Sequence, residues 1–97
     1  MAISAEHIDM RLKDFPGWSR DGKSLTRQFV FTTFPDAIAF VTRLAFDAEA
    51  ADHHPDLLIS YRKVTVTWST HSAGGVTEKD FAGVQQANTV AGACGAP

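Results

Sequence analysis

The spacing of apolar residues predicts a short helix near the start of the chain, over residues 5–13. Ile8, Leu12 and Phe15 share one face at helical spacing, and Ser4 stands where a cap is expected. The Pro-Gly pair that follows Phe15 favours a turn and ends this first element.

Two antiparallel strands are predicted next, over residues 17–20 and 23–32. The dipeptide Asp21-Gly22 between them is a strong hairpin signal, because both central positions of that turn favour positive φ. Apolar residues of the second strand alternate to one face. They are Leu25, Phe29 and Phe31.

The longest helical pattern covers residues 32–53, where Pro35 and Asp36 suit a first turn. Two apolar surfaces follow from an advance of about 100° per residue, and such a helix usually has two partners. We expect the sheet to cover the broad stripe and a helix of another subunit to cover the second patch, unless Phe46 is simply one exposed aromatic. The stripe is Ile38, Phe40, Val41, Leu44, Ala45, Ala48 and Ala51, and the patch is Ala39, Phe46 and Ala50.

A second strand pair is predicted over residues 56–61 and 63–70. Val64, Val66 and Trp68 alternate to one face of the latter strand. If this strand continues to residue 71, its parity places His71 on the polar face. A last helix is predicted over residues 77–93, with Thr77 as its cap.

The order helix, two strands, helix, two strands, helix predicts an α+β fold. We expect a four-stranded antiparallel sheet with three helices packed on one face, in one domain over residues 1–97. The other sheet face, or an edge strand, remains free for a partner or a ligand.

Composition excludes several classes of function. The net charge of −2 gives no basic footprint for nucleic acid. No apolar stretch approaches the roughly 18 residues that span a membrane, and the first residues show no signal-peptide core. The single cysteine, Cys94, has no internal partner, so we expect a reducing, cytoplasmic setting.

Candidate chemistry centres on three histidines, His53, His54 and His71, near the ends of predicted elements. Histidine suits proton transfer near neutral pH. Glu49 lies four residues before His53, and on a helix this spacing lets the carboxylate orient that imidazole. Pro55 is expected to end the helix just past the pair. Alternatively, the pair is a solvated helix terminus, and His71 is an exposed loop residue.

Other readings of these residues stay open at this point. Glu49 and His53 could chelate a metal, but no second such pair or cysteine cluster accompanies them, so we expect no metal site. Thr77-x-x-Asp80 is a capping-box pattern, which explains Asp80 without any chemistry. Tyr61 at a strand end is most simply a packing residue.

The joint spacing is more informative than any one residue. Glu49-x₃-His53-His54-Pro55 is followed at fixed intervals by Tyr61, His71 and Asp80. This pattern resembles the signature of the pterin-4a-carbinolamine dehydratase family, whose animal members are also called dimerization cofactors of a homeodomain transcription factor. The signature covers a third of the chain, and the length and element order extend the resemblance over nearly all of it.

The resemblance implies removal of water from 4a-hydroxytetrahydropterin to give quinonoid dihydropterin, without metal or cofactor. This reaction recycles the cofactor of aromatic amino-acid hydroxylases. By similarity, His53 and His71 transfer protons, while His54 positions the pterin and shares in the transfer. Glu49 orients or charges a histidine. Asp80 either supports His71 or caps the last helix.

The same resemblance implies that His54, Leu57 and Tyr61 contact the substrate. Leu57 stands where many relatives carry an aromatic residue, so an aromatic wall for the flat pterin is missing there. The family's subunit arrangement implies a homodimer or homotetramer formed through the central helix and a sheet edge. The rival interpretation is a protein-interaction or coactivator module with vestigial activity, since animal members bind a transcription factor through the central helix.

Overall fold

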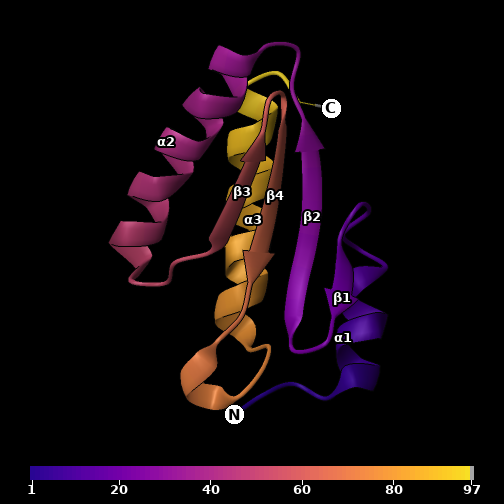
Figure 1. Cartoon of the computed structure of the whole chain (residues 1–97). Helices are drawn as coiled ribbons and strands as arrows, with labels where there is room; N and C mark the ends of the chain where they lie inside the picture. Colours follow the sequence, from indigo (N-terminus) through magenta and orange to yellow (C-terminus); the bar gives the residue numbers. More distant parts are fainter. Residues whose placement is uncertain (97) are drawn as a thin grey trace.

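The computed structural model describes residues 1–96 and consists of three helices, one short 3-10 helix and one antiparallel sheet (Figure 1). The strands lie in the order β1-β2-β4-β3. The predicted α+β class and the order of elements are confirmed. The elements are α1 (Ala5–Leu12), β1 (Ser19–Asp21), β2 (Ser24–Val30), α2 (Phe34–Ala51), β3 (Asp56–Ser60), β4 (Lys63–Trp68), η1 (His71–Ala73) and α3 (Glu78–Ala93).

One face of the sheet forms the core with the helices. Leu25 pairs with Trp68 and Phe29 pairs with Val64 across β2 and β4, and all four side chains are buried. Helices α2 and α3 pack on β4, and α3 also packs on β2. Helix α1 lies beside β1 (Figure 1), where Arg20 bonds Asp9. Because side chains alternate along each strand, one face of the sheet is covered by helices and the other face is open.

The first hairpin is shifted by one residue from its prediction. Asp21 pairs with Ser24 and belongs to β1, so the two turn residues are Gly22 and Lys23. Gly22 has a φ of 59°, whereas Lys23 is not among the residues with positive φ. A positive φ at the first central residue alone is typical of a type II′ turn, which favours glycine there. The Asp-Gly prediction instead assumed a turn in which both central residues have positive φ.

Side-chain caps start all three helices. Ser4 accepts a hydrogen bond from the His7 N–H and Thr33 accepts one from Asp36, which places Pro35 in the first turn of α2 as predicted. Thr77 caps α3, also as predicted. Each cap satisfies a backbone N–H group that the helix itself leaves without a partner.

The apolar stripe of α2 is narrower than predicted. Its buried members are Ala37, Phe40, Leu44 and Ala48. Ile38 is 36% exposed, and Ala45 and Ala51 are also exposed, so the expected stripe is wrong at these three positions. The helix rests on the sheet along one row of residues, and the neighbouring rows remain open. Phe46, of the predicted second patch, is 74% exposed.

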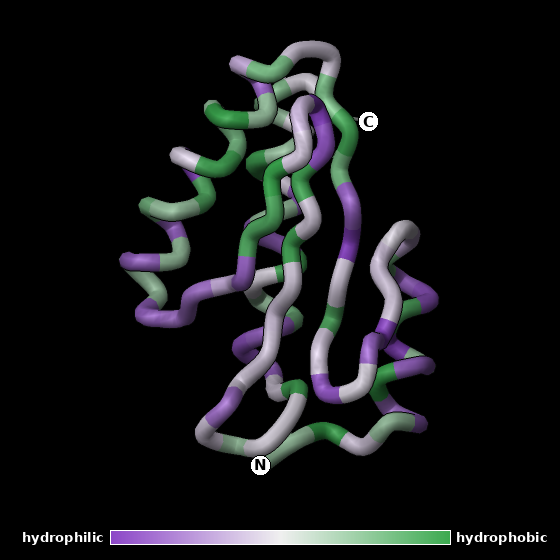
Figure 2. Tube along the Cα trace, in the orientation of Figure 1, coloured by the Kyte–Doolittle hydropathy of each residue, from purple (hydrophilic) through white to green (hydrophobic). Residues whose placement is uncertain are grey.

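The end of α2 lies earlier than predicted. Asp52 adopts a left-handed conformation with φ of 51°, and the N–H of His53 donates to the carbonyl of Ala48. This is a Schellman-type ending, which reverses the chain direction. His53 and His54 therefore lie outside the helix, in the hydrophilic link to β3 (Figure 2).

Within residues 1–96, no helix is long and apolar enough to span a membrane.

Candidate active site

His53 and Asp80 form a histidine–carboxylate contact that is largely shielded from solvent. The Nε2 atom of His53 lies 2.6 Å from Oδ1 of Asp80. The Asp80 side chain is fully buried and that of His53 is 14% exposed. The Schellman ending of α2 turns His53 toward the first turn of α3, where Asp80 is fixed. Two segments 27 residues apart thus supply one histidine–carboxylate pair.

The second oxygen of Asp80 is held by two threonines. Thr70 donates its hydroxyl proton to Oδ2 at 2.8 Å, and the backbone N–H of Thr77 donates to the same atom at 2.8 Å. Thr70 Oγ1 is also 2.9 Å from Thr77 Oγ1. Because a hydroxyl carries one proton, Thr77 is the donor of that last bond. The carboxylate therefore accepts at both oxygens, and His53 presents its proton on Nε2 and leaves Nδ1 for other chemistry.

Trp68 covers one face of the His53 ring. The two rings are stacked, with centroids 5.4 Å apart and an interplanar angle of 20°. The indole is fully buried against Gly83 of α3, where an added Cβ would lie 2.5 Å from two indole carbons. Among residues 1–96, its Nε1 has no hydrogen-bond partner. A buried unpaired donor costs about 1–3 kcal/mol.

His54 and Glu49 form a second pair with an open setting. His54 Nε2 is 2.7 Å from Glu49 Oε1, and the two side chains are 57% and 80% exposed. The prediction that Glu49 faces His53 is wrong, because α2 ends before His53 and the spacing of four residues no longer applies. The turn at Asp52 brings the next histidine to Glu49 instead.

His71 lies next to this network but is not part of it. Strand β4 ends at Trp68, two residues before the predicted end, and His71 begins η1 and is exposed, so the condition for placing it on the strand's polar face is not met. The backbone of Thr70 pairs with Gly75 and closes the loop that carries His71. Within the described residues, the His71 side chain makes no hydrogen bond. Asp80 supports His53 rather than His71, and it also caps α3.

Leu57 and Tyr61 occupy different surroundings. Leu57 is partly buried against the core from β3, where it pairs with Val66. Tyr61 lies in the β3–β4 turn, at the end of the hairpin away from His53 (Figure 1), and is 68% exposed with a φ of 54°. The pairing of Asp56 with Thr67 marks the near end. The fold of one chain therefore does not bring Tyr61 to the histidines.

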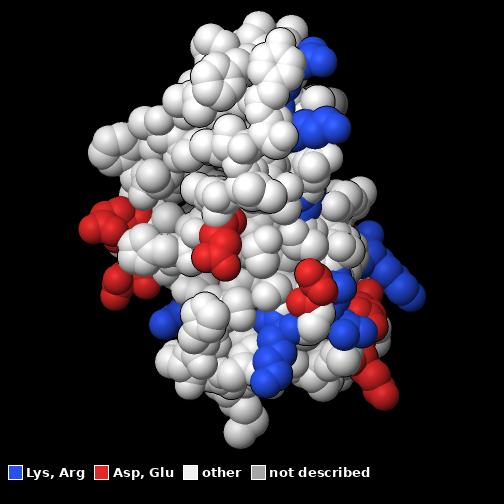
Figure 3. Space-filling model, viewed as in Figure 1, with Lys and Arg blue, Asp and Glu red and all other residues white. Residues whose placement is uncertain are grey.

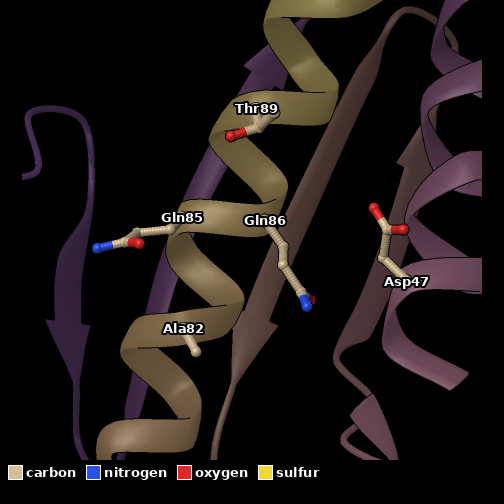
Figure 4. Close-up of a pocket in the computed structure, with 5 residues that line it drawn as sticks. All are labelled: Asp47, Ala82, Gln85, Gln86 and Thr89. Carbon is tan, nitrogen blue, oxygen red and sulfur yellow. The ribbon is translucent and has the colours of Figure 1, made fainter. Parts of the chain in front are cut away.

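Two hollows flank the seam between α2 and α3. A small one of about 80 Å³ touches His53, Trp68 and Gly83. A shallow one of about 460 Å³ lies farther along the seam, where Asp47 and Gln86 extend into it (Figure 4). Small-molecule pockets usually hold about 300–1,000 Å³, so His53 adjoins a crevice too small for a whole ligand. Among the described residues, no three histidine, cysteine or acidic side chains are grouped to hold a metal ion.

Comparison with known proteins identifies the family. A sequence profile described as "Pterin 4 alpha carbinolamine dehydratase" matches residues 1–90. The chain belongs to this family. Among members of the pterin carbinolamine dehydratase family, a Roseiflexus sp. (strain RS-1) protein named "Putative pterin-4-alpha-carbinolamine dehydratase" is 52% identical over 79 residues, covering 81% of this chain and 85% of its own. A Mycobacteroides abscessus protein of the same name is 44% identical over 90 residues, covering 93% and 96%.

Solved structures agree with the pterin dehydratase assignment. The "transcriptional coactivator/pterin dehydratase from Brucella Melitensis" has a TM-score of 0.89 and 33% identity, covering 94% of this chain and 99% of its own. A "pterin dehydratase-like protein", described as "a RuBisCO assembly factor in the alpha-carboxysome", has a TM-score of 0.68 and 25% identity over 78% and 90%. The same fold thus occurs in proteins described with different roles.

Three residues that support the His53–Asp80 pair lie outside the predicted site. Trp68 was assigned to a buried strand face, Thr70 to a strand end and Gly83 to no role. Gly83 carried a signal, since glycine in a helix interior is unfavourable and usually has a packing reason. Thr70 and Trp68 carried none, because their contacts depend on where α3 packs.

Proposed function

We propose that the protein dehydrates 4a-hydroxytetrahydropterin to quinonoid dihydropterin by histidine acid–base catalysis. The observation that carries the proposal is the His53–Asp80 pair, in which a buried carboxylate fixes one ring nitrogen and leaves Nδ1 for the substrate. Histidine is the side chain most often used for general acid–base catalysis, and this role needs no metal.

The reaction needs one proton delivered and one removed. The bond between ring carbon 4a and its hydroxyl breaks as that oxygen gains a proton and leaves as water. The ring N–H gives up its proton as the new double bond forms, so no net proton is consumed. In this proposal, His53 and His71 carry the two protons. His54, oriented by Glu49, positions the pterin beside them.

The test is the absorbance change that follows dehydration of the 4a-hydroxy compound, measured against buffer alone. The variant His53→Ala/His71→Ala should lose most of the catalysed rate and keep its circular dichroism spectrum, because the two imidazoles are the proposed proton carriers. Purified protein no faster than buffer would refute the activity, and a double variant at the wild-type rate would refute the residue assignment.

A second candidate is an interaction module, favoured by the structural relative described as an assembly factor. In this case the protein would bind another protein and dehydrate slowly or not at all. A stable heterocomplex of defined stoichiometry, recovered equally with His53→Ala/His71→Ala, would support this role. A fast dehydration rate abolished by the same variant would support the enzyme.

We also propose that identical subunits associate through α2 and the β3 edge. Large apolar side chains are exposed on both elements, among them Phe46 on α2 and Leu58 on β3 at 67% exposure. In the view of Figure 3, the upper half of the molecule carries few charged side chains. Phe46→Lys should lower the mass measured by light scattering, whereas Met10→Lys, at an exposed apolar site on α1, should not. An unchanged mass for Phe46→Lys would contradict this interface.

A further inference from the structure

We propose that Trp68, seated against Gly83, is a positioning residue that fixes the plane of the His53 imidazole. Its importance for catalysis rests on the proposed dehydration. The stacking itself can be measured without any assay of activity.

Two constraints of different kinds act on the His53 ring. The bond from Nε2 to Asp80 fixes one atom of the ring but leaves the ring free to tilt about that point. Stacking on the indole at an interplanar angle of 20° removes this tilt. Together they fix the direction in which Nδ1 points. A proton-transfer group must be aimed at the reacting atom, so the plane matters as much as the position.

Gly83 makes room for the indole. A Cβ at this position would lie 2.5 Å from Cδ2 and Cε2 of Trp68 and 2.7 Å from Cζ2. Real Cβ atoms do not approach other atoms so closely, so the indole would have to move away. Gly92, in the same helix, has nothing within 4 Å of its added Cβ. The two glycines therefore form a matched pair, of which one is required by Trp68 and the other is not.

The indole is an unfavourable choice for packing alone. Its Nε1 is buried without a partner among the described residues, and an aliphatic side chain opposite an alanine would fill much of this space without an unpaired donor. The flat face that contacts His53 is what the indole adds.

The test compares two double variants that share Gly83→Ala. They differ in whether residue 68 still carries an aromatic ring. Trp68→Phe/Gly83→Ala keeps an aromatic face opposite His53, whereas Trp68→Leu/Gly83→Ala fills the space with an aliphatic group. Proton NMR of the carbon-bound ring protons of His53, assigned with His53→Gln, measures the upfield ring-current shift that a stacked aromatic produces. We expect this shift in the wild type and the phenylalanine variant and its loss in the leucine variant.

The rates provide the second readout. The leucine variant should lose about 10- to 100-fold in kcat with little change in KM, since a misplacement of about 1 Å can cost 100-fold. The phenylalanine variant should recover most of the loss, and Gly92→Ala should match the wild type. Equal His53 shifts in the two double variants, or a leucine variant with wild-type kcat, would overturn the proposal. If neither the wild type nor any variant dehydrates the pterin, the proposed function is wrong. The NMR comparison still tests whether Trp68 fixes the plane of the His53 ring.

Discussion

Two adjacent histidines each contact a carboxylate, and their surroundings could hardly differ more. His53 contacts a fully buried aspartate, which accepts two further hydrogen bonds, from the Thr70 hydroxyl and the Thr77 N–H. His54 meets a glutamate that is 80% exposed. The distances, 2.6 Å and 2.7 Å, are nearly equal.

The comparison teaches that distance does not rank these pairs. Water screens the exposed pair and competes for its hydrogen bonds, so such pairs contribute about 0–1 kcal/mol. Removing one partner of the buried pair instead leaves the other without a partner away from water. Changes to the His53–Asp80 pair should therefore have large effects on stability and activity, and changes to the His54–Glu49 pair should have small ones.

The largest effect is expected for Asp80→Ala. This change leaves His53, the Thr70 hydroxyl and the Thr77 N–H without their acceptor and removes half of the capping box. We expect a loss of about 3 kcal/mol in the free energy of unfolding and of about 100-fold in rate. Urea unfolding and the dehydration assay measure the two. A loss below about 0.5 kcal/mol would show that burial does not distinguish the pairs.

Thr70→Val should have the next largest effect, because Asp80 Oδ2 loses a hydroxyl donor while the side-chain shape is kept. A hydrogen bond to a charged group contributes about 1.5–3 kcal/mol, so a loss of that order is expected in urea unfolding. Thr70→Ser restores the donor and should recover most of the stability. If serine and valine behave alike, the hydroxyl does not support the carboxylate.

Glu49→Gln should have a small effect, since the exposed His54–Glu49 pair is screened by solvent. The expected change in unfolding free energy is below about 0.5 kcal/mol, and the rate should fall by much less than with Asp80→Ala. Adding salt should shrink the difference further. A loss as large as that of Asp80→Ala would reverse the ranking of the two pairs.

The smallest effect is expected at a third ion pair, Asp9–Arg20, which serves as a solvent-exposed reference. The hydrogen bond from Arg20 lowers the pKa of the Asp9 carboxyl below its usual value of 3.8. Because the folded-state pKa is the lower one, the stabilisation is present above the unfolded value and is lost as the pH falls through the folded value. The urea midpoints of wild type and Asp9→Asn should therefore differ slightly near neutral pH and converge in acid. A difference that grows in acid would contradict this sign.

The sequence predicted the layers of the fold better than the contacts of the site. Alternation in β4 and the caps at Ser4 and Thr77 depend on neighbours in sequence, so local patterns were sufficient. The partner of His53 was mispredicted because it depends on a left-handed residue, Asp52, which no periodicity reveals. Because of the same turn, Glu49 contacts His54 instead of His53. Trp68 and Gly83 meet only after α3 has packed on the sheet, which is a tertiary event.

The double use of Asp80 has a consequence for how the protein folds. One carboxylate closes the capping box of α3 and also holds His53, so the start of the last helix and the assembly of the site are the same event. Nucleation of a helix is its costly step. A partly folded chain in which α3 has not formed can contain both hairpins and still lack the acid–base pair. Hydrogen exchange at the start of α3 should therefore report site assembly, and any local opening of that turn would switch the site off without unfolding the sheet.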